Sequence, residues 1–107
     1  MNNNTKVEIL PEDKIQLTQE QKNLIELAFV KQLPPEDAKF IEKVQKEAKN
    51  KVAYDPYSRL SVYYINKYGS DFGMIYLSAI MGGAKKYKQT VNSIEKLKAS
   101  ERIKHQN

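Results

Sequence analysis

Aromatic and basic side chains gather in one part of this 107-residue chain. Seven of the ten aromatic residues lie between residues 54 and 76, with lysine and arginine among and after them. Aromatic rings stack on unpaired bases, and neighbouring cations hold phosphates. The pattern therefore predicts a nucleic-acid site. Its residues are expected to be Tyr64, Tyr68, Arg59, Lys67, Lys85, Lys86, Lys88, Lys96, Lys98 and Arg102. The alternative is that the tyrosines pack the core and keep only their hydroxyl groups at the surface.

The net charge of +5 is confined to one end of the chain. Residues 1–83 hold eleven basic and eleven acidic residues, whereas residues 84–107 hold seven basic and two acidic ones. A positive segment of this kind suits a phosphate backbone or an acidic protein surface. The alternative is an ordinary solvated helix face.

Residue types that commonly carry catalysis are scarce. The chain has no cysteine, and its one histidine is His105. This composition excludes disulfides, thiolate metal sites and Ser-His-Asp chemistry. The glycine pair Gly82-Gly83 precedes Ala84-Lys85-Lys86 without the spacing of a phosphate-binding loop. We therefore expect a protein that is not an enzyme and that needs no cofactor or metal.

Two helices are expected in the first half of the chain. Thr18 and Gln21 form a capping box ahead of a wide apolar stripe. Pro35 suits the first position of a second amphipathic helix, which should fray near Asn50. The expected organisation is a flexible arm over 1–16, one small domain over 17–98 and a basic, frayed tail over 99–107.

The segment over residues 52–77 is expected to form a β-hairpin. Two runs rich in valine, isoleucine and tyrosine flank a Gly-Ser-Asp-Phe-Gly stretch that resembles a loose turn. The fold predicted from this pattern is α+β, with two N-terminal amphipathic helices, a small hairpin and a basic C-terminal helix after Gly82-Gly83. The alternative is a small all-α bundle, because Leu60, Tyr64 and Tyr68 share one face of a helix.

The order of these elements resembles that of phage single-strand annealing proteins of the Bet (Red beta, RecT-type) family. Residues 17–88 carry the resemblance, through Asp55-Pro56-Tyr57 as an Asx-Pro-aromatic turn and through the turn over residues 67–70. Residues 62–65 and 74–77 resemble the two strands, and Lys85-Lys86-Tyr87 resembles the start of the basic helix. The resemblance implies a shortened relative that binds or anneals single strands without ATP or metal.

The function predicted from these observations is binding of nucleic acid, with single-stranded DNA as the expected ligand, in recombination or replication of a phage or mobile element. The alternative is a small inhibitor or adaptor that binds an acidic surface of a replication, CRISPR or transcription enzyme. A homo-oligomer is compatible with either function. The absence of cysteine and of an apolar membrane segment predicts a cytoplasmic protein without membrane contact.

Overall fold

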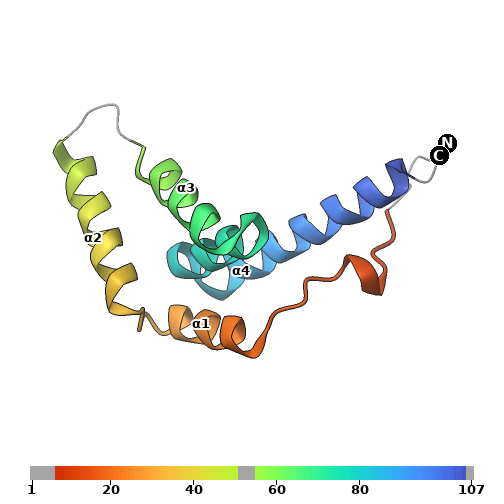
Figure 1. Ribbon diagram of the computed structural model, residues 1–107, viewed down its shortest axis with the longest axis horizontal. Coiled ribbons are helices and arrows are strands. Elements are labelled where there is room, and N and C mark those ends of the chain that lie inside the picture. The colour runs from red at the N-terminus through yellow and green to blue at the C-terminus, as the bar shows by residue number, and fades with distance from the viewer. Residues whose placement is uncertain (1–6, 51–54, 106–107) are drawn as a thin grey trace.

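The fold is a set of helices without strands over the residues that the computed structural model describes, which are 7–50 and 55–105 (Figure 1). The expected α+β fold with a hairpin is therefore wrong, and the all-α alternative is confirmed. The elements are the short 3-10 helix η1 (Pro11–Asp13) and the helices α1 (Gln19–Phe29), α2 (Pro35–Asn50), α3 (Pro56–Tyr68) and α4 (Ser70–Lys104).

The first two long helices begin where the sequence predicts. The Thr18 hydroxyl accepts a hydrogen bond from the Gln21 backbone N–H at 3.1 Å, and the Gln21 side chain accepts one from the Thr18 N–H at 2.9 Å. This capping box satisfies backbone donors that have no partner within the helix. Helix α2 starts at Pro35 and ends at Asn50, as expected.

Residues 56–68 form helix α3 instead of the first strand of the hairpin. Asp55 caps this helix by accepting hydrogen bonds from the backbone N–H groups of Tyr57 and Ser58, at 3.1 and 3.3 Å. Leu60 and Tyr64 lie four positions apart and are both buried. The tendency of valine, isoleucine and tyrosine to form strands depends on context, and here a capped start and a buried helical stripe outweigh it.

The glycines that resembled a hairpin turn have other roles. Gly69, with φ of 94°, joins α3 to α4 in a backbone conformation that favours glycine. Gly73 lies within α4 where this helix crosses α3. A Cβ atom at Gly73 would lie 2.5 Å from the Tyr64 carbonyl oxygen. The second glycine therefore permits close contact between two helices.

Helix α4 reverses direction at Gly83, where φ is 72° and ψ is −161°. The break expected at Gly82-Gly83 is thus confirmed. The reversal brings the second half of α4, residues 84–104, back along the first half, residues 70–82. An ion pair of 3.5 Å between Asp71 and Lys98 joins the two halves.

The core lies where α3, α1 and the first half of α4 meet. Helix α2 packs against α3. Tyr64, Ile75, Tyr76, Leu77 and Val44 are each 0% exposed. Their burial makes the first half of α4 the central element, with the other helices arranged around it.

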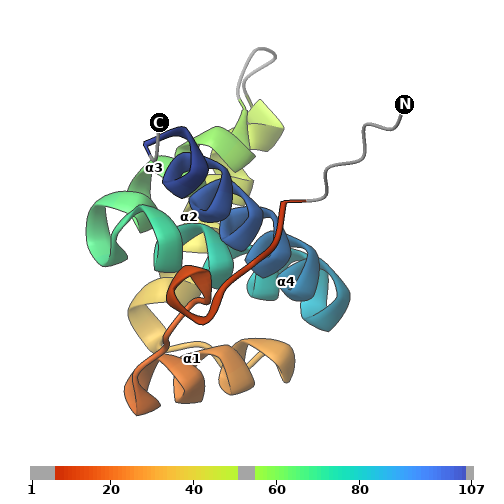
Figure 2. The ribbon, with the colours of Figure 1, turned by 90° about the vertical axis from the view of Figure 1, so that its right-hand side faces the viewer.

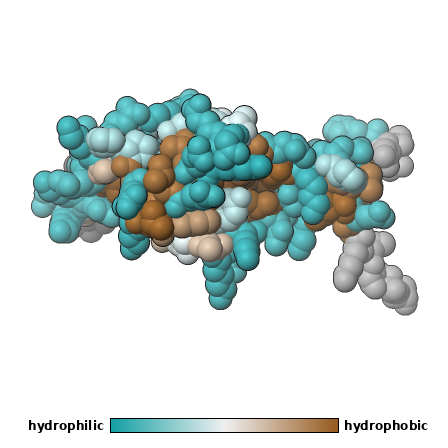
Figure 3. Space-filling model, turned by 90° about the horizontal axis from the view of Figure 1, so that it is seen from below, coloured by the Kyte–Doolittle hydropathy of each residue, from teal (hydrophilic) through white to brown (hydrophobic). Residues whose placement is uncertain are grey.

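The molecule is elongated, with α2 near one end and the second half of α4 near the other (Figure 1). Its radius of gyration is 16.4 Å, whereas a compact chain of this length would have about 13 Å. The segment from residue 7 to residue 16 runs beside the second half of α4 (Figure 2). Seen from below, apolar side chains interrupt the polar surface (Figure 3). Leu27 and Phe29 of α1 are exposed, as is Val30, which follows the helix.

Candidate functional site

Exposed lysine and amide side chains gather on one side of the second half of α4. Residues 85, 89, 92 and 96 are separated by four, three and four positions, a spacing that places them on one side of a helix. Ser93 and Lys86 flank this row. All six side chains are exposed, and we call them the lysine face: Lys85, Lys86, Gln89, Asn92, Ser93 and Lys96.

No carboxylate of the second half of α4 competes for these lysines. The helix carries two acidic residues there. Glu95 is buried, and its Oε2 accepts a hydrogen bond from the Ile15 N–H at 2.9 Å. Glu101 lies 3.7 Å from the imidazole of His105. Among the described residues, Lys85, Lys86 and Lys96 form no ion pair, so their charges are free to meet an external anion.

A groove borders the lysine face where the start of α4 lies against its second half. Met74 and Ile94 contribute apolar side chains to it, and Leu97, which is 63% exposed, lies at its edge. Lys86 and Lys96 also line the groove. Asp71, which pairs with Lys98, lines the groove as well. The surface therefore combines more positive than negative charge with a small apolar strip.

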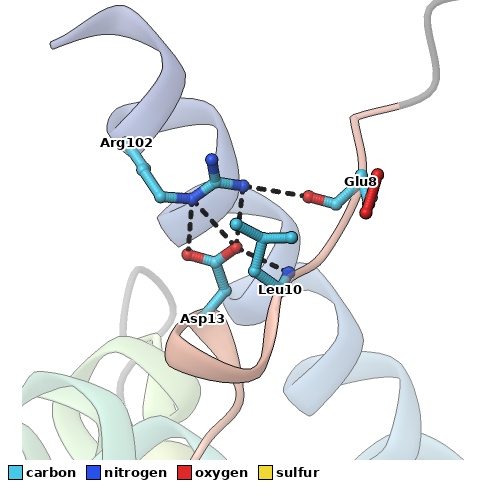
Figure 4. Close-up of polar contacts among 4 residues, drawn as sticks. All are labelled: Glu8, Leu10, Asp13 and Arg102. Atoms are coloured by element: carbon cyan, nitrogen blue, oxygen red, sulfur yellow. Dashed lines mark hydrogen bonds and ion pairs between the residues drawn. The ribbon is translucent and has the colours of Figure 1, made fainter. Parts of the chain in front are cut away.

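The three remaining predicted cations on α4 lie outside the lysine face. Lys98 is paired with Asp71. Arg102 donates to Asp13 at 3.0 Å from Nη2 and at 3.2 Å from Nε, and its Nη2 also donates to the Glu8 carbonyl at 3.1 Å (Figure 4). These hydrogen bonds join the N-terminal segment to the helix. Lys88 is exposed and forms no ion pair with another described residue.

The predicted tyrosines belong to the core. Tyr64 is 0% exposed, and its ring lies edge-to-face with Tyr76 at 5.5 Å. Tyr68 is half-buried and packs edge-to-face against Phe72 and Tyr76, at 5.5 and 5.4 Å. Both rings contact other aromatic rings of the core. Tyr64 therefore presents no free stacking surface, and the packing of Tyr68 restricts access to its ring.

The two predicted cations of α3 are held by contacts to α2. The guanidinium of Arg59 lies 5.3 Å from the centre of the Phe40 ring, and the side chain remains exposed. Lys67 donates to Glu36 at 2.8 Å and to Asp37 at 3.2 Å. Burial disfavours the ammonium of Lys67, but the hydrogen bonds to both carboxylates outweigh it and raise its pKa.

A buried carboxylate at the start of α2 was missed by sequence reasoning, which placed Asp37 only in a favourable first turn. Asp37 is 0% exposed and accepts hydrogen bonds from Lys67 and from the Tyr76 hydroxyl, the latter at 3.0 Å. Its position in the sequence could have predicted its burial. Asp37 lies four and seven positions before Ile41 and Val44, which places it on the same buried stripe of the helix. Burial, followed by the nearby carboxylate, raises the pKa of Tyr76.

The contacts of the N-terminal segment were also missed. The hydrogen bond from Arg102 is the main cause that holds the pKa of Asp13 below its ordinary value. Asp13 also accepts a hydrogen bond from the Leu10 N–H at 2.9 Å (Figure 4). No sequence signal links positions 13 and 102, because they lie on different elements and no helical or strand period relates them.

Comparisons of the chain with models of protein families, with curated proteins and with solved structures found no match. Over the described residues, no helix is long and apolar enough to cross a membrane. The same residues contain no group of three or more histidine, aspartate or glutamate side chains that could hold a metal ion.

Proposed function

We propose that the protein binds nucleic acid through the lysine face and catalyses no reaction. One observation carries this proposal: three exposed lysines without an ion-pair partner among the described residues lie on one helix side, interleaved with Gln89, Asn92 and Ser93. Lysine neutralises phosphates, and amide and hydroxyl groups donate hydrogen bonds to phosphates, sugars and bases.

The distribution of charge supports the same proposal. The net charge of +5 lies entirely in residues 84–107. The Lys98 and Arg102 charges in this segment are paired with Asp71 and Asp13. Lys88 and Lys104 are exposed and add to the positive potential beside the lysine face. A polyanion approaching this end of the molecule is therefore attracted before contact.

The proposal does not depend on the resemblance to annealing proteins. Residues 62–65 and 74–77, which resembled strands of that family, lie in α3 and α4. A role in recombination or replication stays a prediction. The packing of Tyr64 and Tyr68 does not support base stacking by these residues. The proposed contacts to nucleic acid are therefore those of the lysine and amide side chains of the lysine face.

A binding titration with a charge-matched control tests the proposal. The variant combines Lys85→Gln, Lys86→Gln and Lys96→Gln, and the control combines Lys39→Gln, Lys43→Gln and Lys49→Gln on exposed positions of α2. Both lose three positive charges. We expect fluorescence anisotropy at low salt to show binding of labelled DNA that the first variant weakens about tenfold or more.

The control variant should bind DNA with nearly the affinity of the unmodified protein. An equal loss in both variants would mean that overall charge, and not the lysine face, determines binding. No binding of single-stranded or double-stranded DNA by the unmodified protein would refute the proposal.

A second candidate function is binding of an acidic protein surface. The exposed Leu97, beside Met74 and Ile94 in a groove that Lys86 and Lys96 line, favours it. An apolar strip flanked by lysines fits an acidic amphipathic segment. The test is Leu97→Ser: capture of a defined partner after nuclease treatment should be lost, whereas the affinity for DNA should be unchanged.

A further inference from the structure

We propose that the lysine face binds double-stranded DNA in the major groove, in preference to single strands. This inference rests on the proposed function and specifies the form of nucleic acid. Two features support it. The first is the arrangement of Lys85 and Lys96 around Gln89 and Asn92 on the lysine face. The second is that the described residues of the second half of α4 offer no free aromatic ring for base stacking.

The dimensions of the lysine face fit a groove of duplex DNA. Lys85 and Lys96 are eleven positions apart, which is about 16 Å along a helix. The major groove of B-form DNA is about 12 Å wide and admits an α-helix. Lysines at the two ends can therefore reach phosphates on both sides of the groove, while the helix between them faces the base pairs.

The residues between the two ends are suited to base edges. Gln89 and Asn92 lie on the same side of the helix as Lys85 and Lys96, and both are exposed. Glutamine and asparagine amides form paired hydrogen bonds with the N6 and N7 atoms of adenine. Ser93, with its short side chain, allows the helix to come close. The expected target is thus a duplex that contains A·T pairs.

The rings near the lysine face are engaged within the protein. Tyr87 is half-buried, with its ring edge-to-face with Phe29 at 5.4 Å. Tyr64 and Tyr68 pack in the core. Tyr57 is 44% exposed, but it lies at the start of α3. Binding of single strands relies on aromatic platforms beside a basic groove, and the described residues of the second half of α4 provide none.

The lysine face is also accessible. Its six side chains are exposed, although this part of α4 runs beside the first half of the helix and shares a groove with Ser70, Asp71 and Met74. The N-terminal segment runs beside the C-terminal end of α4 (Figure 1). That segment contacts Glu95 and Arg102, which lie seven positions apart on one side of the helix. Lys85 and Lys96 lie on a different side and remain exposed. A duplex can therefore approach without displacing the segment.

The test compares one labelled duplex rich in A·T pairs with each of its two strands, by fluorescence anisotropy of the full-length protein. We expect the duplex to bind at least tenfold more tightly than either strand. The double variant Gln89→Ala and Asn92→Ala should weaken binding of the duplex about tenfold while keeping the salt dependence, because it leaves the lysines in place.

A second measurement identifies the groove. Saturating the minor groove with netropsin should leave the affinity for the duplex unchanged. Displacement by netropsin, or an unchanged affinity in the Gln89 and Asn92 double variant, would overturn docking in the major groove. Circular dichroism of the variant checks that its helices are intact.

The outcomes separate this inference from the proposed function. Tighter binding of a single strand than of the duplex overturns the inference and leaves nucleic-acid binding in place. Failure of all three DNA molecules to bind overturns both. Tighter duplex binding that is lost in the double variant and resists netropsin supports both.

Discussion

Two buried tyrosines differ in what their hydroxyl groups contact. The Tyr76 hydroxyl donates to the buried carboxylate of Asp37 at 3.0 Å. The Tyr64 hydroxyl is buried near the same carboxylate but makes no hydrogen bond of acceptable geometry with a described residue. A hydrogen bond to a charged group stabilises the fold more than a neutral one, and a buried hydroxyl without a partner costs free energy.

This difference predicts that the same chemical change affects stability differently at the two positions. Tyr76→Phe should lower the free energy of unfolding by about 1.5–3 kcal/mol, because it removes a hydrogen bond to a buried charge. Tyr64→Phe should change it by less than about 0.5 kcal/mol or increase it. Urea denaturation of both variants measures the effect. Equal losses would show that Tyr64 has a hydrogen-bond partner after all.

The pair of Asp13 and Arg102 predicts how stability changes in acid. The pKa of Asp13 lies below its ordinary value of 3.8, so the unfolded chain takes up the proton first as the pH falls. The contribution of Asp13 to stability is therefore present above pH 3.8 and is lost as the pH falls through the pKa of the folded state.

Asp13→Asn should lower the midpoint of urea denaturation at neutral pH and have a smaller effect at a pH below 3.8, where the unfolded chain and then the folded protein take up the proton on Asp13. Asp71→Asn is the control, since its ion pair with Lys98 is half-exposed and such pairs contribute little. The same loss in Asp13→Asn at both pH values would contradict the linkage.

At the scale of elements, Gly83 determines how the halves of α4 are arranged. Its φ of 72° and ψ of −161° lie in a region that residues with an L side chain avoid. The mirror image of this conformation, with φ near −72° and ψ near 161°, is common extended backbone. The position thus favours glycine or a D-amino acid.

Gly83→Ala should lower the free energy of unfolding by about 1–3 kcal/mol, because L-alanine is strained there. D-alanine at position 83, introduced by chemical synthesis, should avoid this loss because it adopts the observed backbone without strain. Thermal denaturation of the two proteins compares them. If L- and D-alanine destabilised the protein equally, the strain explanation would fail.

At the scale of the whole molecule, positive charge is separated from a neutral body. The affinity for DNA should therefore fall as salt rises, with a slope set by the number of phosphates that lysines contact. Replacing Lys85, Lys86 and Lys96 with glutamine should reduce the magnitude of the slope for duplex DNA by about 2.7. The α2 control with three replaced lysines should keep the original slope, and a reduced slope in both would exclude a local contact surface.

Patterns among neighbouring residues were sufficient to predict part of the fold and part of the candidate site. The capping box at Thr18, the start of α2 at Pro35 and the break at Gly82-Gly83 all depend on neighbouring residues, and the structure confirms them. The exposed lysines of the second half of α4 were among the predicted site residues for the same reason. Charge and helical spacing can be read without knowledge of the neighbouring elements.

Only the tertiary structure decided how the aromatic segment folds and which cations are free. Leu60 and Tyr64 have side chains that strands also accept, and burial against α4 determines that they lie on a helix. Lys67 and Arg102 are paired with Asp37 and Asp13, partners at least thirty residues away in the chain. Such pairings depend on packing between elements, which composition and periodicity do not encode. The sequence therefore determined where positive charge is concentrated, and the packing determined which side chains present it.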